Sequence, residues 1–183
     1  GLTHRTENLS MQVAGFVTHG HDVIERVLTG SQNAEGENEV TKQNIGHQTI
    51  GGVEFGAAYR LARNVTLFGN LTWLDGDQEA PEIVGGPIIE SAPSRLMPLT
   101  YQAGLRFEAP GPGWVVEARW IHADIADQLS PSDERDDTRI PPGGTPGYDV
   151  FDVMGSFPIG PGSRMIFGVE NITDEVYRVH GSG

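Results

Sequence analysis

Residues 48–75, QTIGGVEFGAAYRLARNVTLFGNLTWLD, most constrain the fold because apolar and polar side chains alternate along two successive runs. A period of two residues indicates a β-strand with one apolar face, and residues 61–64 between the runs predict a tight turn. Each arm has about the 9–11 residues that a tilted strand needs to cross a bilayer. A soluble, half-buried sheet produces the same alternation, so the hairpin alone leaves both environments open. The apolar side carries Val53, Phe55, Ala57, Tyr59, Val65, Leu67, Leu71 and Trp73, with Phe68 as an exception on the polar side.

Composition narrows the class of protein. The chain has 183 residues with Gly 25 and Pro 12, and no segment shows a sustained apolar period of 3.6 residues, which predicts an almost all-β protein. The formal net charge of -13 repels nucleic-acid phosphates and excludes DNA and RNA as expected partners. With Cys 0, disulfides, cysteine zinc sites and thiol nucleophiles are excluded for this chain. No apolar run is long enough for a transmembrane helix.

The predicted connections alternate in length along the chain. Strands are predicted at residues 9–17 with an extension through 22–26, 40–45 leading into the hairpin, 100–108, 114–123, 148–157 and 164–171. Long polar loops are predicted at 29–39, 75–98 and 130–147, and short turns at 61–64, 110–113 and 158–163. Short turns at one end and long loops at the other are typical of outer-membrane β-barrels, whose aromatic residues gather near strand ends. We therefore predict an all-β, antiparallel meander of about seven strands that forms part of a large transmembrane β-barrel and does not close on itself.

The end of the chain resembles a known family. Residues 168–183, GVENITDEVYRVHGSG, resemble the penultimate strand and last outer loop of TonB-dependent outer-membrane receptors. Three more segments are similar to successive parts of the same family: IGGVE at 50–54, SRLMPL at 94–99 and DTRIPPGGTPGY at 137–148. The order and spacing of these segments cover nearly all of the chain.

The resemblance implies a barrel of about 22 strands, filled by an N-terminal plug, in which energy from TonB opens the plug to ferric siderophores, haem, cobalamin or similar scarce nutrients. Residues 1–183 show no plug domain, no TonB-contacting box and no closing strand. We therefore expect the C-terminal portion of such a receptor in the bacterial outer membrane, functional only within the whole. The expected partners are membrane lipid, the rest of the barrel with its plug, TonB, and a small metal chelate or similar ligand.

Several side chains are candidates for a site, each with a simpler alternative. His19 and His21 share one face of a predicted strand and could bind a metal ion, although two solvated histidines give the same pattern. The acidic loop residues could face a ligand or hold Ca²⁺, but they lack the spacing of a calcium loop. Tyr177 and His180 occupy positions of the family pattern and could contact ligand or fix the last loop. The loop candidates are Asp75, Asp77, Glu79, Asp133, Glu134, Asp136, Asp137, Tyr177 and His180.

The sequence bears on two other classes of protein. A soluble all-β binding module, such as a sandwich or a lectin-like domain with the acidic loops as its binding end, must bury the apolar stripe under a second sheet. A serine hydrolase is not supported, since no nucleophile elbow is present in the sequence. We expect no catalytic residue and no cofactor.

Overall fold

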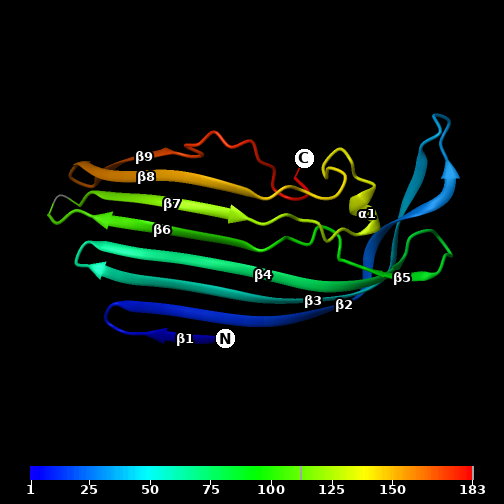
Figure 1. Ribbon diagram of the computed structural model, residues 1–183, viewed down its shortest axis with the longest axis horizontal. Coiled ribbons are helices and arrows are strands. Elements are labelled where there is room, and N and C mark those ends of the chain that lie inside the picture. Colours follow the sequence, from blue (N-terminus) through cyan, green and yellow to red (C-terminus); the bar gives the residue numbers. More distant parts are fainter. Residues whose placement is uncertain (112, 183) are drawn as a thin grey trace.

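The computed structural model describes residues 1–111 and 113–182, and Ile45 through its backbone only. The chain forms a nine-stranded antiparallel sheet in the order β1-β2-β3-β4-β6-β7-β8-β9, with β5 paired to β4 (Figure 1). The elements are β1 (Leu2–Arg5), β2 (Leu9–Gln32), β3 (Asn38–Ala62), β4 (Val65–Pro81), β5 (Ile88–Ser91), β6 (Thr100–Glu108), β7 (Val115–Ala123), α1 (Pro131–Glu134), β8 (Tyr148–Gly160) and β9 (Ser163–Val169).

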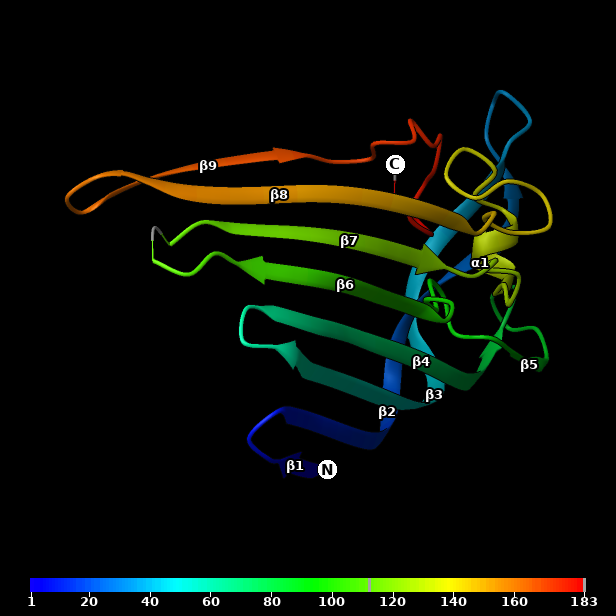
Figure 2. The same cartoon turned by 60° about the vertical axis from the view of Figure 1, so that its left-hand side comes forward.

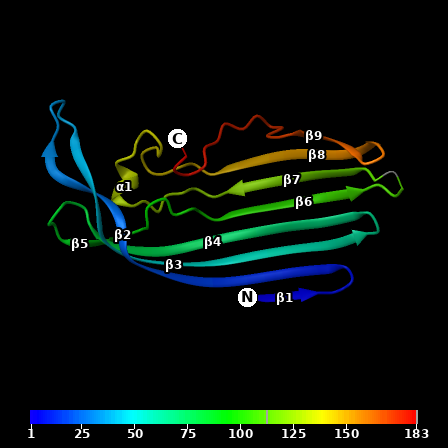
Figure 3. The same cartoon turned by 180° about the vertical axis from the view of Figure 1, so that it is seen from behind.

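The all-β meander is confirmed. The short turns between β1 and β2, β3 and β4, β6 and β7, and β8 and β9 lie at one end of the sheet, and the two long connections, β4 to β6 and β7 to β8, lie at the other end with the tip of the β2–β3 hairpin. The view from behind shows the same division (Figure 3). The strands β1 and β9 form the two edges, so the described sheet is open, as predicted.

Several predicted boundaries are wrong because the strands continue beyond their apolar segments. The predicted loop at 29–39 is mostly strand, with a turn at 33–37 in which the Asn33 side chain accepts N–H bonds from Glu35 and Glu37. The predicted loop at 75–98 begins as strand, since β4 continues through Pro81 and pairs with β5. Outside the apolar band apolar side chains no longer form one continuous exposed face, so backbone pairing persists while the hydrophobic alternation disappears. The strands β1 and β5 and the helix α1 were also not predicted, and Pro112 of the predicted turn at 110–113 lies outside the described residues.

One face of the sheet carries a continuous band of exposed apolar side chains. The register places Phe55 beside Leu71 and Leu71 beside Tyr101, and it places Leu67 beside Leu105. Leu67 is 43% and Leu105 is 49% exposed, so neither is covered by a second layer. From Val65 to Trp73, β4 extends about 26 Å, which is comparable with the roughly 25 Å apolar belt of a barrel. Aromatic pairs border the band, Trp120 with Tyr101 toward the loops and Trp114 with Phe157 toward the turns.

The sandwich alternative lacks its second sheet within residues 1–111 and 113–182. The fully buried apolar side chains are instead mostly near the loop end, at Val27, Ala80, Leu96, Ala123, Ala126, Ile140 and Val150. Phe68, the exception in the pattern, lies on the polar face over its cross-strand partner Gly104, where a Cβ atom would collide with the phenyl ring. The apolar side chains of the sheet face are exposed, and the buried apolar side chains gather near the loop end. This arrangement is expected of a barrel wall.

The outer half of the β2–β3 hairpin leaves the plane of the sheet and rises beside the loop that carries α1 (Figure 2). Asp22 has a φ of 54°, and the register shifts between His21 and Ile24. An extra residue in one strand bends the pair and re-aims the side chains that follow. Arg135 holds the raised hairpin to the loop by donating to the carbonyl oxygen of Arg26 at 3.1 Å. No helix among the described residues has the length and apolarity to span a membrane.

Candidate ligand-binding loops

Asp133 organises the long loop between β7 and β8. Ser130 caps helix α1, where its hydroxyl accepts the Asp133 N–H at 3.1 Å and donates to the Asp133 carboxylate at 3.0 Å. Ser94 also donates to this carboxylate, at 3.3 Å, and the Arg95 backbone N–H donates to it at 3.1 Å. The Asp133 side chain is 0% exposed, and the Arg95 Nε atom is 3.4 Å from its Oδ1 atom. This carboxylate therefore joins the loop before β6 to the loop before β8.

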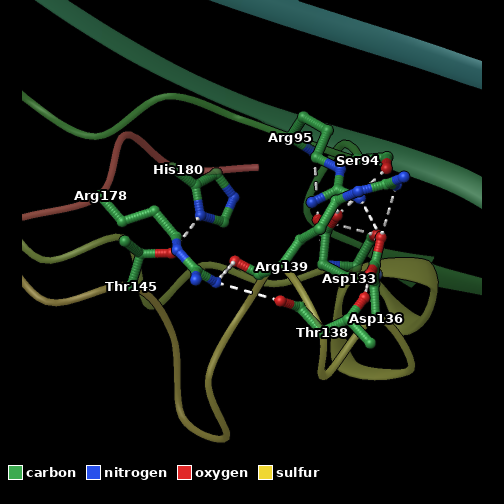
Figure 4. Close-up of polar contacts among 10 residues, drawn as sticks. Ser94, Arg95, Asp133, Asp136, Thr138, Arg139, Thr145, Arg178 and His180 are labelled. Carbon is green, nitrogen blue, oxygen red and sulfur yellow. Dashed lines mark hydrogen bonds and ion pairs between the residues drawn. The ribbon is translucent and has the colours of Figure 1, made fainter. Parts of the chain in front are cut away.

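A second carboxylate extends the cluster toward the surface (Figure 4). Asp136 forms ion pairs with Arg95 and with Arg139, the latter at 3.2 Å, and accepts from the Thr138 hydroxyl at 3.0 Å. Burial alone would raise the pKa of Asp136. The hydrogen bonds from Thr138 and Arg95 and the charges of Arg95 and Arg139 outweigh that effect and lower the pKa. Asp136 is therefore held as an anion between two cations.

The C-terminal segment is fastened to the same loop. Arg178 donates to the carbonyl oxygens of Thr138 and Arg139, at 3.1 and 3.0 Å, and His180 Nδ1 lies 2.9 Å from the Thr145 hydroxyl (Figure 4). Burial lowers the pKa of His180, although the charge of Asp133 opposes this shift. A neutral imidazole suits this site, because it pairs with a hydroxyl without leaving a buried charge uncompensated.

A cationic groove lies between this cluster and the base of the raised hairpin. The groove has a volume of about 360 Å³, and Arg26, Lys42, Arg95 and Arg139 line it together with the single acid Glu25. Burial raises the pKa of Glu25. Ser94, Ser132, Ile24 and Gly181 complete the lining. Arg95 and Arg139 are paired with carboxylates of the loop cluster, so the groove cations without such a partner among the described residues are Arg26 and Lys42.

Arg26 and Lys42 are also opposite one another in the β2–β3 register. Like charges at directly opposite positions destabilise an antiparallel pair. Among the ion pairs formed by described residues, neither side chain has a carboxylate partner. An anion bound between the two side chains would relieve this repulsion.

The structure separates the acidic residues suggested by the sequence. Asp75, Asp77 and Glu79 lie on strand β4, and their exposed side chains share the face that carries the apolar band. Asp133 is enclosed by its own loop, and Asp136 is paired with arginines. The other two acidic candidates of this loop, Glu134 and Asp137, are exposed at the surface.

The remaining candidates are placed as follows. Tyr177 packs against Tyr148 with ring centroids 4.5 Å apart, whereas His180 bonds to Thr145. His19 and His21 share a face, but His19 bonds to Thr49 and His21 lies opposite His47. The sequence did not predict the groove cations as a set because they come from distant segments. Two of them, Arg95 and Arg139, lie in the SRLMPL and DTRIPPGGTPGY segments of the resemblance.

Comparison with known proteins defines the class. Residues 1–172 match the family described as TonB dependent receptor-like, beta-barrel. This chain belongs to that family, whose barrels are those of bacterial outer-membrane receptors and transporters. No curated protein sequence matches the chain.

Solved structures support the fold. The chain is similar to the copper transporter OprC, with a TM-score of 0.77 and 20% sequence identity over 97% of this chain and 26% of that one. It is also similar to the FrpB iron transporter from Neisseria meningitidis (F3-3 variant), with a TM-score of 0.68 and 15% identity over 97% of this chain and 26% of that one. The chain thus spans about a quarter of the length of these transporters.

Proposed function

We propose that this chain forms a C-terminal part of the barrel of a TonB-dependent transporter in the bacterial outer membrane. The rest of the barrel, the plug domain, the TonB contact and the closing strand lie in other parts of that receptor. The family match and the exposed apolar band support this placement. The sheet has two unpaired edge strands, β1 and β9, which further strands of a barrel would pair in lipid.

The cargo that the groove favours is an anionic metal chelate, such as a ferric siderophore with carboxylate or catecholate groups, or haem with its propionates. The observation that carries this assignment is the set of four cationic side chains around one groove, of which Arg26 and Lys42 have no carboxylate partner among the described residues. A bare metal cation would be repelled there, whereas guanidinium and ammonium groups make strong charge-assisted hydrogen bonds to carboxylate oxygens. Cyanocobalamin, which has no net charge, would gain less from these cations.

Reversing charge in the groove is expected to impair capture of an anionic chelate. In the complete receptor, Arg26→Glu or Lys42→Glu should each weaken binding of labelled ferric citrate or haemin at least about tenfold, since each removes a charge-assisted contact and adds repulsion. Arg63→Glu, in the turn at the opposite end of the sheet, is the matched control and should bind as the unmodified receptor does. Equilibrium binding and uptake into cells measure the effect.

Either of two outcomes would contradict the cargo assignment. One is unchanged affinity for both anionic probes in the two groove variants. The other is uptake of cyanocobalamin with no binding of ferric citrate, haemin or a catecholate siderophore.

A further inference from the structure

Two histidines meet on the face of the sheet opposite the buried Gln78 and Ala80. His21 of β2 and His47 of β3 are directly opposite each other in the antiparallel register. Their Nδ1 atoms are 3.1 Å apart, and their rings meet edge to face with centroids 5.2 Å apart. Both side chains are exposed to solvent, so the pair is accessible from outside the sheet.

The separation of the two nitrogens suits a shared metal ion. Imidazole nitrogens bind Zn²⁺ at about 2.0–2.1 Å, so two of them on a tetrahedral ion are about 3.3 Å apart. An N–H···N hydrogen bond between neutral rings has nearly the same length, so an ion could replace the shared proton with little movement. We propose that His21 and His47 form a surface site for a borderline transition-metal cation, with Cu²⁺ bound most tightly and Ni²⁺ and Zn²⁺ more weakly.

The neighbouring strand offers a further ligand. Glu79 of β4 is opposite His47 in the register, and its side chain is exposed on the same face. Direct cross-strand neighbours have Cβ atoms about 4.5–5.5 Å apart, which is within reach of a glutamate that changes rotamer. No three metal-binding groups of the described residues already surround one point. The site is therefore open, with two imidazoles fixed by the register and the Glu79 carboxylate and water completing the coordination.

His19 is an internal control for the proposed His21–His47 site. It lies on the same face two residues earlier, but its Nδ1 atom is 3.0 Å from the Thr49 hydroxyl and has no histidine opposite it. The proposal therefore assigns the ion to the cross-strand pair and leaves His19 outside the site.

The position of the pair suggests what a bound ion would do. The bulge at Asp22 directly follows His21, and the raised half of the hairpin begins there. An ion bridging β2 and β3 at this point would hold the base of that hairpin, whose next residues include Arg26 and Lys42. The site is on the face of the sheet that carries the apolar band. The proposal does not depend on the cargo assigned to the groove.

The test is a Cu²⁺ titration of the complete receptor in detergent, followed by electron paramagnetic resonance. The unmodified receptor should bind one Cu²⁺ more than the His21→Gln or His47→Gln variant, or bind it at least about tenfold more tightly, because each variant loses a direct ligand. Nitrogen coupling should correspond to two imidazoles in the unmodified receptor and to one in each variant. His19→Gln should retain both the ion and the two-nitrogen spectrum.

Folding of all variants is checked by the heat-dependent shift of the barrel in electrophoresis, which exposed substitutions should not change. The proposal is overturned if both single variants bind Cu²⁺ with the stoichiometry and affinity of the unmodified receptor. It is also overturned if His19→Gln removes the ion while His21→Gln and His47→Gln retain it.

Discussion

Leu105→Arg is expected to destabilise the membrane-embedded receptor by about 2–4 kcal/mol, the cost of an arginine facing lipid near the middle of a bilayer. Leu105 is exposed on the apolar face, beside Leu67 of β4 and Ala118 of β7. In lipid its replacement would place a guanidinium group among acyl chains, with a long path to water. The effect is measured as the free energy of unfolding by urea or guanidinium in lipid vesicles.

The matched control is Asn70→Arg, on the polar face of the same sheet. Asn70 lies beside Gly56 and Gln102 and is exposed, so an arginine there would point into the barrel interior. We expect it to change the unfolding free energy by less than about 1 kcal/mol. If Asn70→Arg proved as costly as Leu105→Arg, or the order were reversed, the assignment of the two faces would be wrong.

Asp133→Ala is expected to disrupt the loops, at a cost of about 3–5 kcal/mol for breaking a buried ion pair. The substitution removes the acceptor shared by the backbone N–H groups of Ser130 and Arg95 and by the hydroxyls of Ser94 and Ser130. It also leaves Arg95 with Asp136 as its one remaining carboxylate partner. Because Arg95 lines the groove, anionic chelate binding should fall together with loop order. Proteolysis and amide exchange of residues 92–99 and 130–145 in the complete receptor measure the change.

Asp137→Ala is the control for this prediction, since Asp137 is an exposed acid four residues further along the same loop. It should leave exchange rates and chelate binding nearly unchanged. If Asp133→Ala and Asp137→Ala gave the same amide exchange rates and the same chelate binding, the structural role assigned to Asp133 would be contradicted.

The apolar band of the sheet could be predicted from the sequence because apolar side chains on one face and polar side chains on the other give a period of two. Val53, Phe55, Leu67 and Trp73 follow this rule, and the structure pairs Val53 with Trp73 on one face. The rule fails outside the band. Residues 29–32 of β2 and 75–81 of β4 form strands held by backbone pairing, with no apolar face to reveal them.

The loop cluster was less predictable because its members are far apart in the sequence. The sequence indicated Asp133 as one of several acidic candidates for a ligand-facing loop. Its burial depends on Ser94 and Arg95, which come from a loop about 40 residues earlier. The acidic loop residues were expected to face a ligand or hold Ca²⁺, whereas the folded loops pair Asp133 and Asp136 with arginines and leave a cationic groove beside them. The sequence did not indicate His47 as the partner of His21, because their pairing depends on the register between β2 and β3.

The most direct test of the central claim is the environment of successive side chains along β6 in the reconstituted receptor. This chain has Cys 0, so a single cysteine carrying a spin label introduces the only thiol within it. The account predicts that labels at Leu105 and Phe107 collide mainly with oxygen dissolved in lipid, and that labels at Arg106 and Glu108 collide mainly with a water-soluble nickel chelate. Equal accessibility to the chelate at all four positions would contradict a barrel wall and would show that water covers both faces of the sheet.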